Sequence, residues 1–196
     1  VGCVGSPLVF GVGVVCLEKI LVLGAFGQIG SELVPYLREK YGEENVVAVG
    51  HNKKPIGEMK KGPIDFGNVS DKNSIENLVK KHRADTIYHL SAILSATGEK
   101  NPQLAYDVSM NGTYNVLEVG REQNLQRIMI PSSIAAFGPE TPRDNTPNET
   151  IQRPTTMYGV TKVAGELLGN YYFQKFGLDV RGVRFPGIIS NVSTPG

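Results

Sequence analysis

From Lys19 onwards, short runs of apolar and β-branched residues alternate with longer polar segments that carry apolar residues at helical spacing. This alternation is typical of a parallel sheet whose strands are joined by crossover helices. We expect strands at residues 20–23, 45–49, 63–66, 86–90, 127–132 and 179–185. We expect helices at residues 28–41, 72–82, 102–123 and 157–176. The pattern predicts one α/β domain over residues 19–196, a doubly wound parallel sheet of the Rossmann type with helices on both faces.

The first seventeen residues differ from the rest of the chain because they carry no charge and are rich in Gly and Val. A secretory signal would have basic residues before its apolar run, and a mitochondrial leader would be amphipathic and rich in Arg. The segment is also short for a membrane span. We interpret residues 1–18 as an apolar N-terminal extension outside the fold.

Composition and charge narrow the classes of partner. The chain has 196 residues, and its 20 basic and 19 acidic side chains give a formal net charge of +1. Without a long run of either sign, nothing attracts nucleic acid or an anionic membrane from a distance. The two cysteines, Cys3 and Cys16, cannot build a disulfide framework. A small-molecule enzyme fits this balance best.

A glycine-rich loop separates the first predicted strand from the first predicted helix. It reads Gly24-Ala25-Phe26-Gly27-Gln28-Ile29-Gly30. Glycine lets the backbone turn tightly and approach a pyrophosphate, and the helix N-terminus that follows offers unpaired amides. A tight strand-to-helix turn needs glycine for steric reasons as well, but the position between strand and helix favours dinucleotide binding.

The residue that usually selects between NAD and NADP is absent. At the end of the second strand, where a carboxylate normally binds the ribose of NAD, the chain has Gly50-His51-Asn52. Lys53 and Lys54 follow, which would tolerate a 2′-phosphate or form a solvated turn. These residues leave the choice of dinucleotide open.

Tyr158 and Lys162 stand at helical i and i+4 positions, downstream of the hydroxyl pair Ser132-Ser133. Such a pair shares a helix face, so the ammonium of Lys162 could lower the pKa of the Tyr158 phenol and make it a base. With Ser133 at the same point, a substrate alcohol could be held while a cofactor takes its hydride. The spacing alone also fits an ordinary solvated helix face.

The histidines offer a weaker signal. His82 ends a polar helix and is interpreted as solvated, whereas His89, at the end of the fourth strand, is interpreted as packed near the cofactor. No group of His, Asp, Glu or Cys has metal-ligand spacing, so we predict no metal site. An unaided tyrosine base is therefore preferred over zinc-dependent chemistry.

Taken together, the glycine loop, Ser133, Tyr158 and Lys162 resemble the extended short-chain dehydrogenase/reductase family, and within it the branch that oxidises L-threonine. The resemblance covers residues 19–196. It is carried by the strings Gly27-Gln28-Ile29-Gly30-Ser31-Glu32-Leu33, His89-Leu90-Ser91-Ala92-Ile93-Leu94-Ser95-Ala96, Pro131-Ser132-Ser133-Ile134-Ala135-Ala136-Phe137-Gly138, Met157-Tyr158-Gly159-Val160-Thr161-Lys162-Val163-Ala164-Gly165-Glu166 and Arg184-Phe185-Pro186-Gly187-Ile188-Ile189-Ser190.

The resemblance implies oxidation of the L-threonine hydroxyl to 2-amino-3-oxobutyrate with NAD as cofactor. Tyr158 would be the base, Ser133 would hydrogen-bond the substrate oxygen, and Lys162 would hold the nicotinamide ribose. Ser95, Ser133 and Tyr158 would contact the substrate. The implied cofactor-binding residues are Gly24, Phe26, Gly27, Gln28, Ile29, His51, Asn68, Val69, Leu90, Ser91, Ala92, Tyr158, Lys162, Pro186 and Ile188.

The chain departs from that family pattern at four positions, namely Leu23 for Thr, Gly50 for Asp, Asn68 for Asp and Ser109 for Asn. Losing one ribose contact would weaken the affinity for the dinucleotide about ten-fold. Relatives also continue well beyond Gly196, so we expect the C-terminal substrate lobe to be missing.

Two other readings stay open, a nucleotide-sugar epimerase or dehydratase and an inactive remnant that only binds dinucleotide. The resemblance further implies a homodimer without nucleic-acid or membrane partners. It implies a mitochondrial location if the source is eukaryotic and a cytoplasmic one if it is bacterial.

Overall fold

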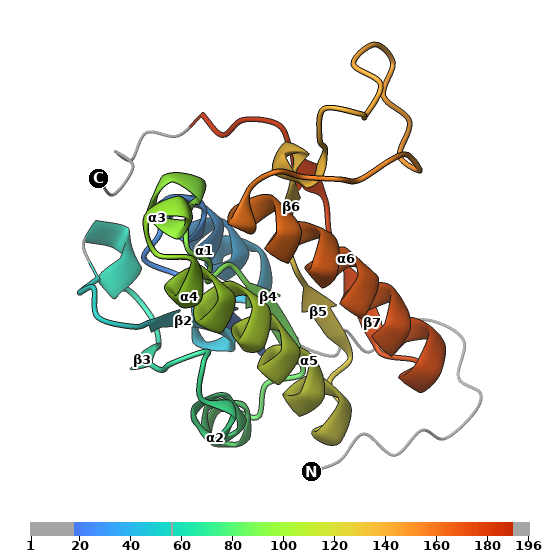
Figure 1. The fold of residues 1–196 in the computed structure, drawn as a ribbon. Helices are drawn as coiled ribbons and strands as arrows, with labels where there is room; N and C mark the ends of the chain where they lie inside the picture. The colour runs from blue at the N-terminus through green and yellow to red at the C-terminus, as the bar shows by residue number, and fades with distance from the viewer. Residues whose placement is uncertain (1–17, 56, 190–196) are drawn as a thin grey trace.

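A computed structural model describes residues 18–55 and 57–189. The predicted extension at residues 1–18 therefore lies outside the described residues, apart from Glu18. The main sheet has six parallel strands in the order β3-β2-β1-β4-β5-β7. They are β1 (Ile20–Leu23), β2 (Val46–Gly50), β3 (Ile64–Phe66), β4 (Thr86–His89), β5 (Arg127–Met129) and β7 (Asp179–Arg181). The predicted Rossmann-type class is confirmed (Figure 1).

Successive residues of β1 point to opposite faces of the sheet, and each set enters a separate core. Leu21 and Leu23 join a cluster with α2 (Lys72–His82), α5 (Gly112–Glu122) and α6 (Met157–Phe176). Ile20 and Val22 pack on the other face against α1 (Gln28–Tyr41). All four residues are nearly fully buried, which explains why this strand is a continuous apolar run.

Three helices, α1, α2 and α6, have the predicted bounds, and α2 and α6 begin at residues whose side chains cap them. The Asp71 carboxylate accepts a hydrogen bond from the Asn73 amide at the start of α2. The Thr156 hydroxyl accepts one from the Gly159 amide, 3.0 Å away, at the start of α6. Gly177, with φ of 72°, ends α6 in the left-handed conformation that glycine adopts without strain.

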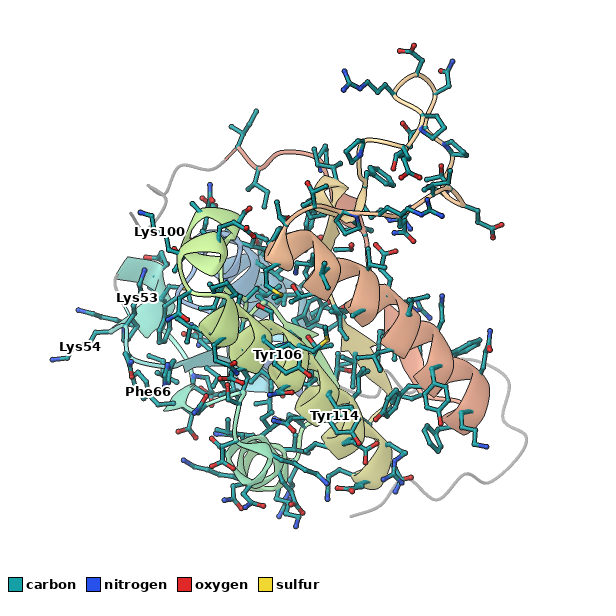
Figure 2. All side chains as sticks on the ribbon, in the orientation of Figure 1. Lys53, Lys54, Phe66, Lys100, Tyr106 and Tyr114 are labelled. Carbon is teal, nitrogen blue, oxygen red and sulfur yellow. The ribbon has the colours of Figure 1, made fainter. Side chains whose placement is uncertain are left out.

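The predicted helix 102–123 is wrong in its interior. The structure has α4 (Pro102–Ala105), a π-helical segment η3 (Tyr106–Asn111) and then α5. Within η3 the Ser109 hydroxyl accepts a hydrogen bond from the Ile93 amide, 3.1 Å away. The Thr113 hydroxyl donates to the Ser109 carbonyl, 2.7 Å away. Such side-chain bonds compete with the regular helical ladder. Tyr106 and Tyr114 project outward from this side of the molecule (Figure 2).

Two predicted strands are also interrupted. Strand 127–132 divides into β5 and β6 (Ser132–Ser133) because Pro131 has no amide hydrogen for the ladder. Strand 179–185 divides into β7 and β8 (Arg184–Phe185), where Gly182 passes so close to Ile130 that a Cβ would lie 2.3 Å from its carbonyl oxygen. β6 and β8 pair in parallel as a separate small sheet.

Shorter elements complete the fold. They are α3 (Ser95–Lys100) and the 3₁₀ turns η1 (Glu43–Asn45), η2 (Gly57–Lys60) and η4 (Ile134–Ala136). Ser95, which the resemblance implies as a substrate contact, is the first residue of α3.

Candidate functional site

The order in which successive strands are added to the sheet reverses between β1 and β4, and the glycine loop lies at this switch point. The β1 strand pairs with β2 on one side and with β4 on the other. In such sheets the crevice outside the carboxyl ends of the strands is the usual ligand site. Gly24 has φ of 79°, and a Cβ there would lie 2.8 Å from the Ser91 amide nitrogen. Only glycine therefore allows the loop to sit this close to the end of β4.

The first turn of α1 completes a cradle for an anion. Gly30 lies so close to the loop that a Cβ would come within 2.3 Å of the Ala25 carbonyl oxygen. The first amides of a helix have no intrahelical partner, and the positive end of the helix dipole lies beside them. This geometry fits the pyrophosphate of a dinucleotide.

Two hollows flank this loop, one on each side. The larger, a cavity of about 400 Å³, contains the loop, the end of β4, the predicted catalytic residues and the segment after β8. It is lined by Gly24, Gly27, Gln28, Ile29, Gly30, His89, Leu90, Ala92, Leu94, Pro131, Ser132, Ser133, Tyr158, Lys162, Phe185, Pro186, Gly187 and Ile188.

The smaller hollow, about 90 Å³, lies beyond the ends of β1, β2 and β3. It is lined by Leu23, Gly24, Val49, Gly50, His51, Gly67, Asn68, Val69, Ile75, Leu78, Ser91 and Val108. Together the two hollows match the two halves of a dinucleotide that crosses the glycine loop, with nicotinamide in the larger and adenosine in the smaller.

The three predicted catalytic residues line the same larger cavity. Ser133 ends β6 and caps η4, where its hydroxyl accepts a hydrogen bond from the Ala135 amide, 3.2 Å away. Tyr158 and Lys162 come from the first turns of α6, and the Lys162 Nζ lies 5.3 Å from the centre of the Tyr158 ring. The Lys162 ammonium donates to the Pro131 carbonyl, 2.8 Å away, which anchors it beneath the cavity.

The expected lowering of the Tyr158 pKa is wrong for this arrangement. Burial raises the pKa of the Tyr158 phenol, and a hydrogen bond with Ser133 offsets the rise in part. Burial also lowers the pKa of Lys162 to about 8, so it exchanges its proton near neutrality. The Lys162 ammonium donates its hydrogen bond to a backbone carbonyl, and in the absence of substrate the hydrogen bond with Ser133 acts to lower the Tyr158 pKa.

His89 lies between the catalytic residues and η3 and is almost fully buried. Its Nε2 lies 3.2 Å from the Thr113 hydroxyl oxygen. Because that hydroxyl already donates to Ser109, Nε2 must carry the proton, and the buried Nδ1 is left as an acceptor without a hydrogen-bond partner. Burial and then the charge of Lys162 lower the pKa of His89 to about 3, so the imidazole is neutral.

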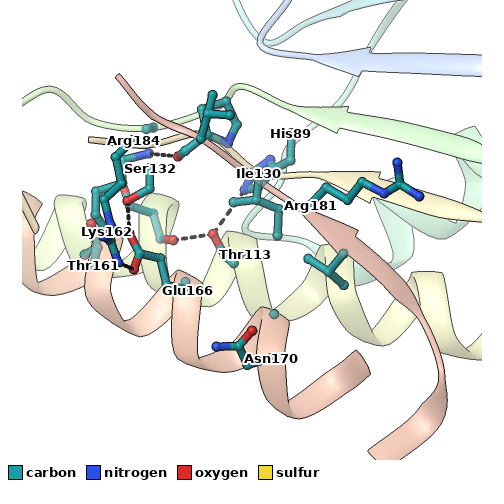
Figure 3. A pocket seen from close by; sticks show the side chains of 18 of the residues that line it. His89, Thr113, Ile130, Ser132, Thr161, Lys162, Glu166, Asn170, Arg181 and Arg184 are labelled. Atoms are coloured by element: carbon teal, nitrogen blue, oxygen red, sulfur yellow. Dashed lines mark hydrogen bonds and ion pairs between the residues drawn. The ribbon is translucent and has the colours of Figure 1, made fainter. Parts of the chain in front are cut away.

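Behind Lys162 lies a third hollow of about 630 Å³, between α6 and the ends of β5 and β7 (Figure 3). On its wall, the Glu166 carboxylate accepts hydrogen bonds from the Ser132 hydroxyl, from Gln152 Nε2 at 2.9 Å and from Arg184 Nη2 at 2.7 Å. Burial alone would raise the pKa of Glu166, but these bonds outweigh it and lower the pKa to about 2. Glu166 therefore ties α6 to β6 and β8, the strands that carry the site.

The structure brings most of the predicted binding residues together at these hollows, but two are elsewhere. Ser95 does not line the larger cavity, where its neighbour Leu94 does. Phe26 lies against Gly50 and forms a tilted pair with Phe66, with ring centres 6.1 Å apart. Sequence reasoning did not foresee Leu94, Phe185 or the Glu166 cluster, whose partners are far apart along the chain.

Neither a metal cluster nor a membrane-spanning helix is found among the described residues. Over residues 18–55 and 57–189, no group of three or more His, Cys, Asp or Glu side chains could hold a metal ion. Within the same ranges, no helix has both the length and the apolar character that a membrane span requires.

Comparison with known proteins places this geometry in context. Residues 20–195 match the NAD dependent epimerase/dehydratase family. An uncharacterized epimerase/dehydratase of Staphylococcus saprophyticus is 54% identical over 181 residues, which cover 92% of this chain and 56% of that protein.

Solved structures with a similar fold cover most of this chain. The L-threonine dehydrogenase of Clostridium difficile has a TM-score of 0.88 at 50% identity, over 92% of this chain and 56% of that one. The holo form of a GalE-like L-threonine dehydrogenase from Cupriavidus necator has a TM-score of 0.85 at 46% identity, over 91% and 58%. The chain thus spans little more than half the length of these proteins, and it belongs to the NAD dependent epimerase/dehydratase family.

Proposed function

We propose that this chain carries the catalytic centre for NAD-dependent oxidation of the L-threonine hydroxyl to 2-amino-3-oxobutyrate. The observation that carries the proposal is the single cavity in which Ser133, Tyr158 and Lys162 face the glycine loop. The substrate is suggested by the likeness, at 46–50% identity, to enzymes named as L-threonine dehydrogenases.

In this mechanism the threonine hydroxyl lies between the Ser133 and Tyr158 oxygens. The phenolate of Tyr158 takes the hydroxyl proton, and Ser133 donates a hydrogen bond to the same substrate oxygen. The C–H bond at the β-carbon breaks as the C=O bond forms. NAD, when bound, accepts the hydride with its electron pair.

Lys162 has two tasks in this mechanism. Held by the Pro131 carbonyl, its ammonium is 5.3 Å from the Tyr158 ring centre, where it favours negative charge on the phenolate as the proton is lost. It also lies on the wall that the nicotinamide ribose would contact. Because burial raises the pKa of Tyr158, the positive charge of Lys162 is needed for the phenol to act as a base.

The binding of the threonine ammonium and carboxylate is a separate part of the proposal. Among the described residues that line the larger cavity, Lys162 is the only one with a charged Lys, Arg, Asp or Glu side chain. We infer that partners for the two charged ends of threonine come from the portion of the relatives that this chain does not match.

The proposal is tested by offering NAD together with L-threonine or with UDP-glucose to this chain extended by the portion of the relatives that it does not match. We expect formation of NADH with L-threonine and no change in the sugar nucleotide. Conversion of UDP-glucose to its epimer would support the epimerase alternative instead. Binding of NAD without turnover of either compound would support the remnant alternative.

We also propose a homodimer formed through α6. Val160, Leu167 and Tyr171 form one stripe of this helix, and their side chains are 44%, 61% and 53% exposed. An apolar stripe of this kind is typical of a protein interface. The staphylococcal source of the curated relatives favours the cytoplasmic over the mitochondrial alternative.

A further inference from the structure

The adenosine side of the site contains no carboxylate. The polar side chains that line the smaller hollow come from His51, Asn68 and Ser91, and no Asp or Glu is among its lining residues. A carboxylate at the end of the second strand binds the ribose 2′-hydroxyl of NAD and repels the 2′-phosphate of NADP. This chain therefore lacks the usual means of rejecting NADP.

Phe26 occupies the place of the missing acid. Gly50 ends β2, and a Cβ at this position would lie 2.3 Å from the Phe26 Cε2 atom. The Phe26 ring is held there by its tilted contact with Phe66 of β3. An aspartate at position 50 could not be accommodated without moving this ring.

No neighbouring strand supplies a replacement carboxylate. Asp65 of β3 pairs in register with Val49, but its carboxylate binds Lys81 Nζ at 2.7 Å and His82 Nε2 at 2.8 Å, at the C-terminal end of α2. These partners lower the pKa of Asp65 to about 2 against the opposing effect of burial. Its charge is thus already neutralised and lies outside the hollow.

Two lysines follow the end of β2 in place of the carboxylate. His51 lines the hollow, and Lys53 and Lys54 extend into solvent from the segment after β2 (Figure 2). Across residues 18–55 and 57–189, no ion pair involves either lysine. A 2′-phosphate carries up to two negative charges, so two lysines that follow His51 directly after Asn52 favour it over a hydroxyl.

We propose that the adenosine end of this site accepts a 2′-phosphate, so that the chain binds NADP as well as NAD, with Lys53 and Lys54 as the phosphate-facing cations. The inference rests on the dinucleotide site and is independent of the substrate. It predicts dissociation constants for NADP and NAD within about ten-fold of each other, where a site with the carboxylate discriminates far more strongly.

The test is titration calorimetry of the whole chain with NAD and with NADP at low and high salt. We expect the double variant Lys53→Ala/Lys54→Ala to raise the dissociation constant of NADP roughly three- to ten-fold and that of NAD less than about two-fold. Added salt should weaken NADP more than NAD. Arg143→Ala/Lys175→Ala, which removes the same charge from the loop before α6 and from its last turn, should leave both affinities unchanged.

A second variant tests the role of the aromatic ring. The double variant Phe26→Ala/Gly50→Asp introduces a carboxylate at the end of β2 and the space for it. It should weaken the binding of NADP at least about ten-fold relative to that of NAD. Phe26→Ala alone should not change this ratio. NADP that binds over 100-fold more weakly than NAD, or not at all, overturns the proposal while leaving threonine oxidation untouched. Equal loss of both dinucleotides in the lysine variant overturns the assignment of Lys53 and Lys54.

Discussion

Lys162 and His89 are two basic residues that line the larger cavity, and burial lowers the pKa of each. At neutral pH the imidazole of His89 is uncharged, because the pH is far above its pKa of about 3, and Lys162 carries the one positive charge of the pair. A single positive charge beneath the cavity suits a reaction in which the tyrosine passes through its anionic form. The spacing of Tyr158 and Lys162 predicted that they share a helix face, but it could not predict that a backbone carbonyl would hold the ammonium.

The buried neutral His89 makes stability depend on pH. Its folded-state pKa of about 3 is below the unfolded value of 6.5, so its contribution is complete above pH 6.5 and is lost as the pH falls toward 3. Between pH 7 and pH 5 the loss is on the order of 2 kcal/mol. Urea unfolding of His89→Gln at the two pH values should show a correspondingly smaller loss than wild type.

The matched control for this measurement is His51→Gln, which replaces an exposed histidine. It should keep the wild-type difference between the two pH values. An unchanged difference in His89→Gln would show that His89 is accessible to protons in the folded state.

Among the elements, α6 is the one on which the site depends most. Its predicted bounds agree with the structure, in which Thr156 and Gly177 cap the helix, but the Glu166 cluster was not predicted. Glu166 binds Ser132 and Arg184, which lie on strands that the sequence did not separate. The break at Pro131 follows from its missing amide hydrogen, which is visible in the sequence, whereas the break at Gly182 depends on its close approach to Ile130, which a pattern read along one strand does not contain.

The segment 102–123 shows a different limit. Its apolar periodicity is continuous, so a single helix was expected, and only the bonds made by Ser109 and Thr113 reveal the π-helical turn. Single-turn π-helices within longer helices are frequent at functional sites. This one places Thr113 against His89 beside the catalytic residues.

Glu166→Gln should destabilise the chain by about 2–4 kcal/mol, because Arg184 would lose a partly buried carboxylate partner. The Glu166 pKa of about 2 is below the ordinary glutamate value of 4.5, so this contribution is present above pH 4.5 and lost as the pH falls toward 2. Urea unfolding at pH 7 measures the change.

Glu140→Gln is the control, since Glu140 pairs with Arg153 at side-chain exposures of 55% and 70%. It should change the unfolding free energy by less than about 0.5 kcal/mol. Equal effects of the two substitutions would contradict a special role for the Glu166 cluster.

On the scale of the molecule, the alternation of apolar runs and helices predicted the sheet and both of its covered faces. The two buried clusters on opposite faces of β1 are the physical reason, since each strand must bury two rows of side chains. The detailed shape of the hollows depends on where single glycines allow close approach, as at Gly24 and Gly30. Three glycines in a loop indicate that approach, but not how large the space beside it is.

The exposed stripe on α6 predicts the state of association. Sedimentation velocity should show a dimer for the wild type and a monomer for Leu167→Glu, because a buried charge in an apolar interface is costly. Ile151→Glu changes a side chain of similar exposure, 46%, in the loop before α6 and should remain dimeric. A monomeric wild type would contradict the proposed interface.

The most direct test of the proposed catalytic centre is the rate of NADH formation from NAD and L-threonine, with NAD affinity measured in parallel. The rate is compared between this chain extended by the portion of the relatives that it does not match, taken as wild type, and its Tyr158→Phe variant. The account predicts NADH formation by the wild type and a rate reduced about 10²- to 10⁴-fold in the variant, because the base is lost. NAD should bind both proteins equally. Equal rates in the two proteins, or no NADH from a wild type that binds NAD, would contradict it.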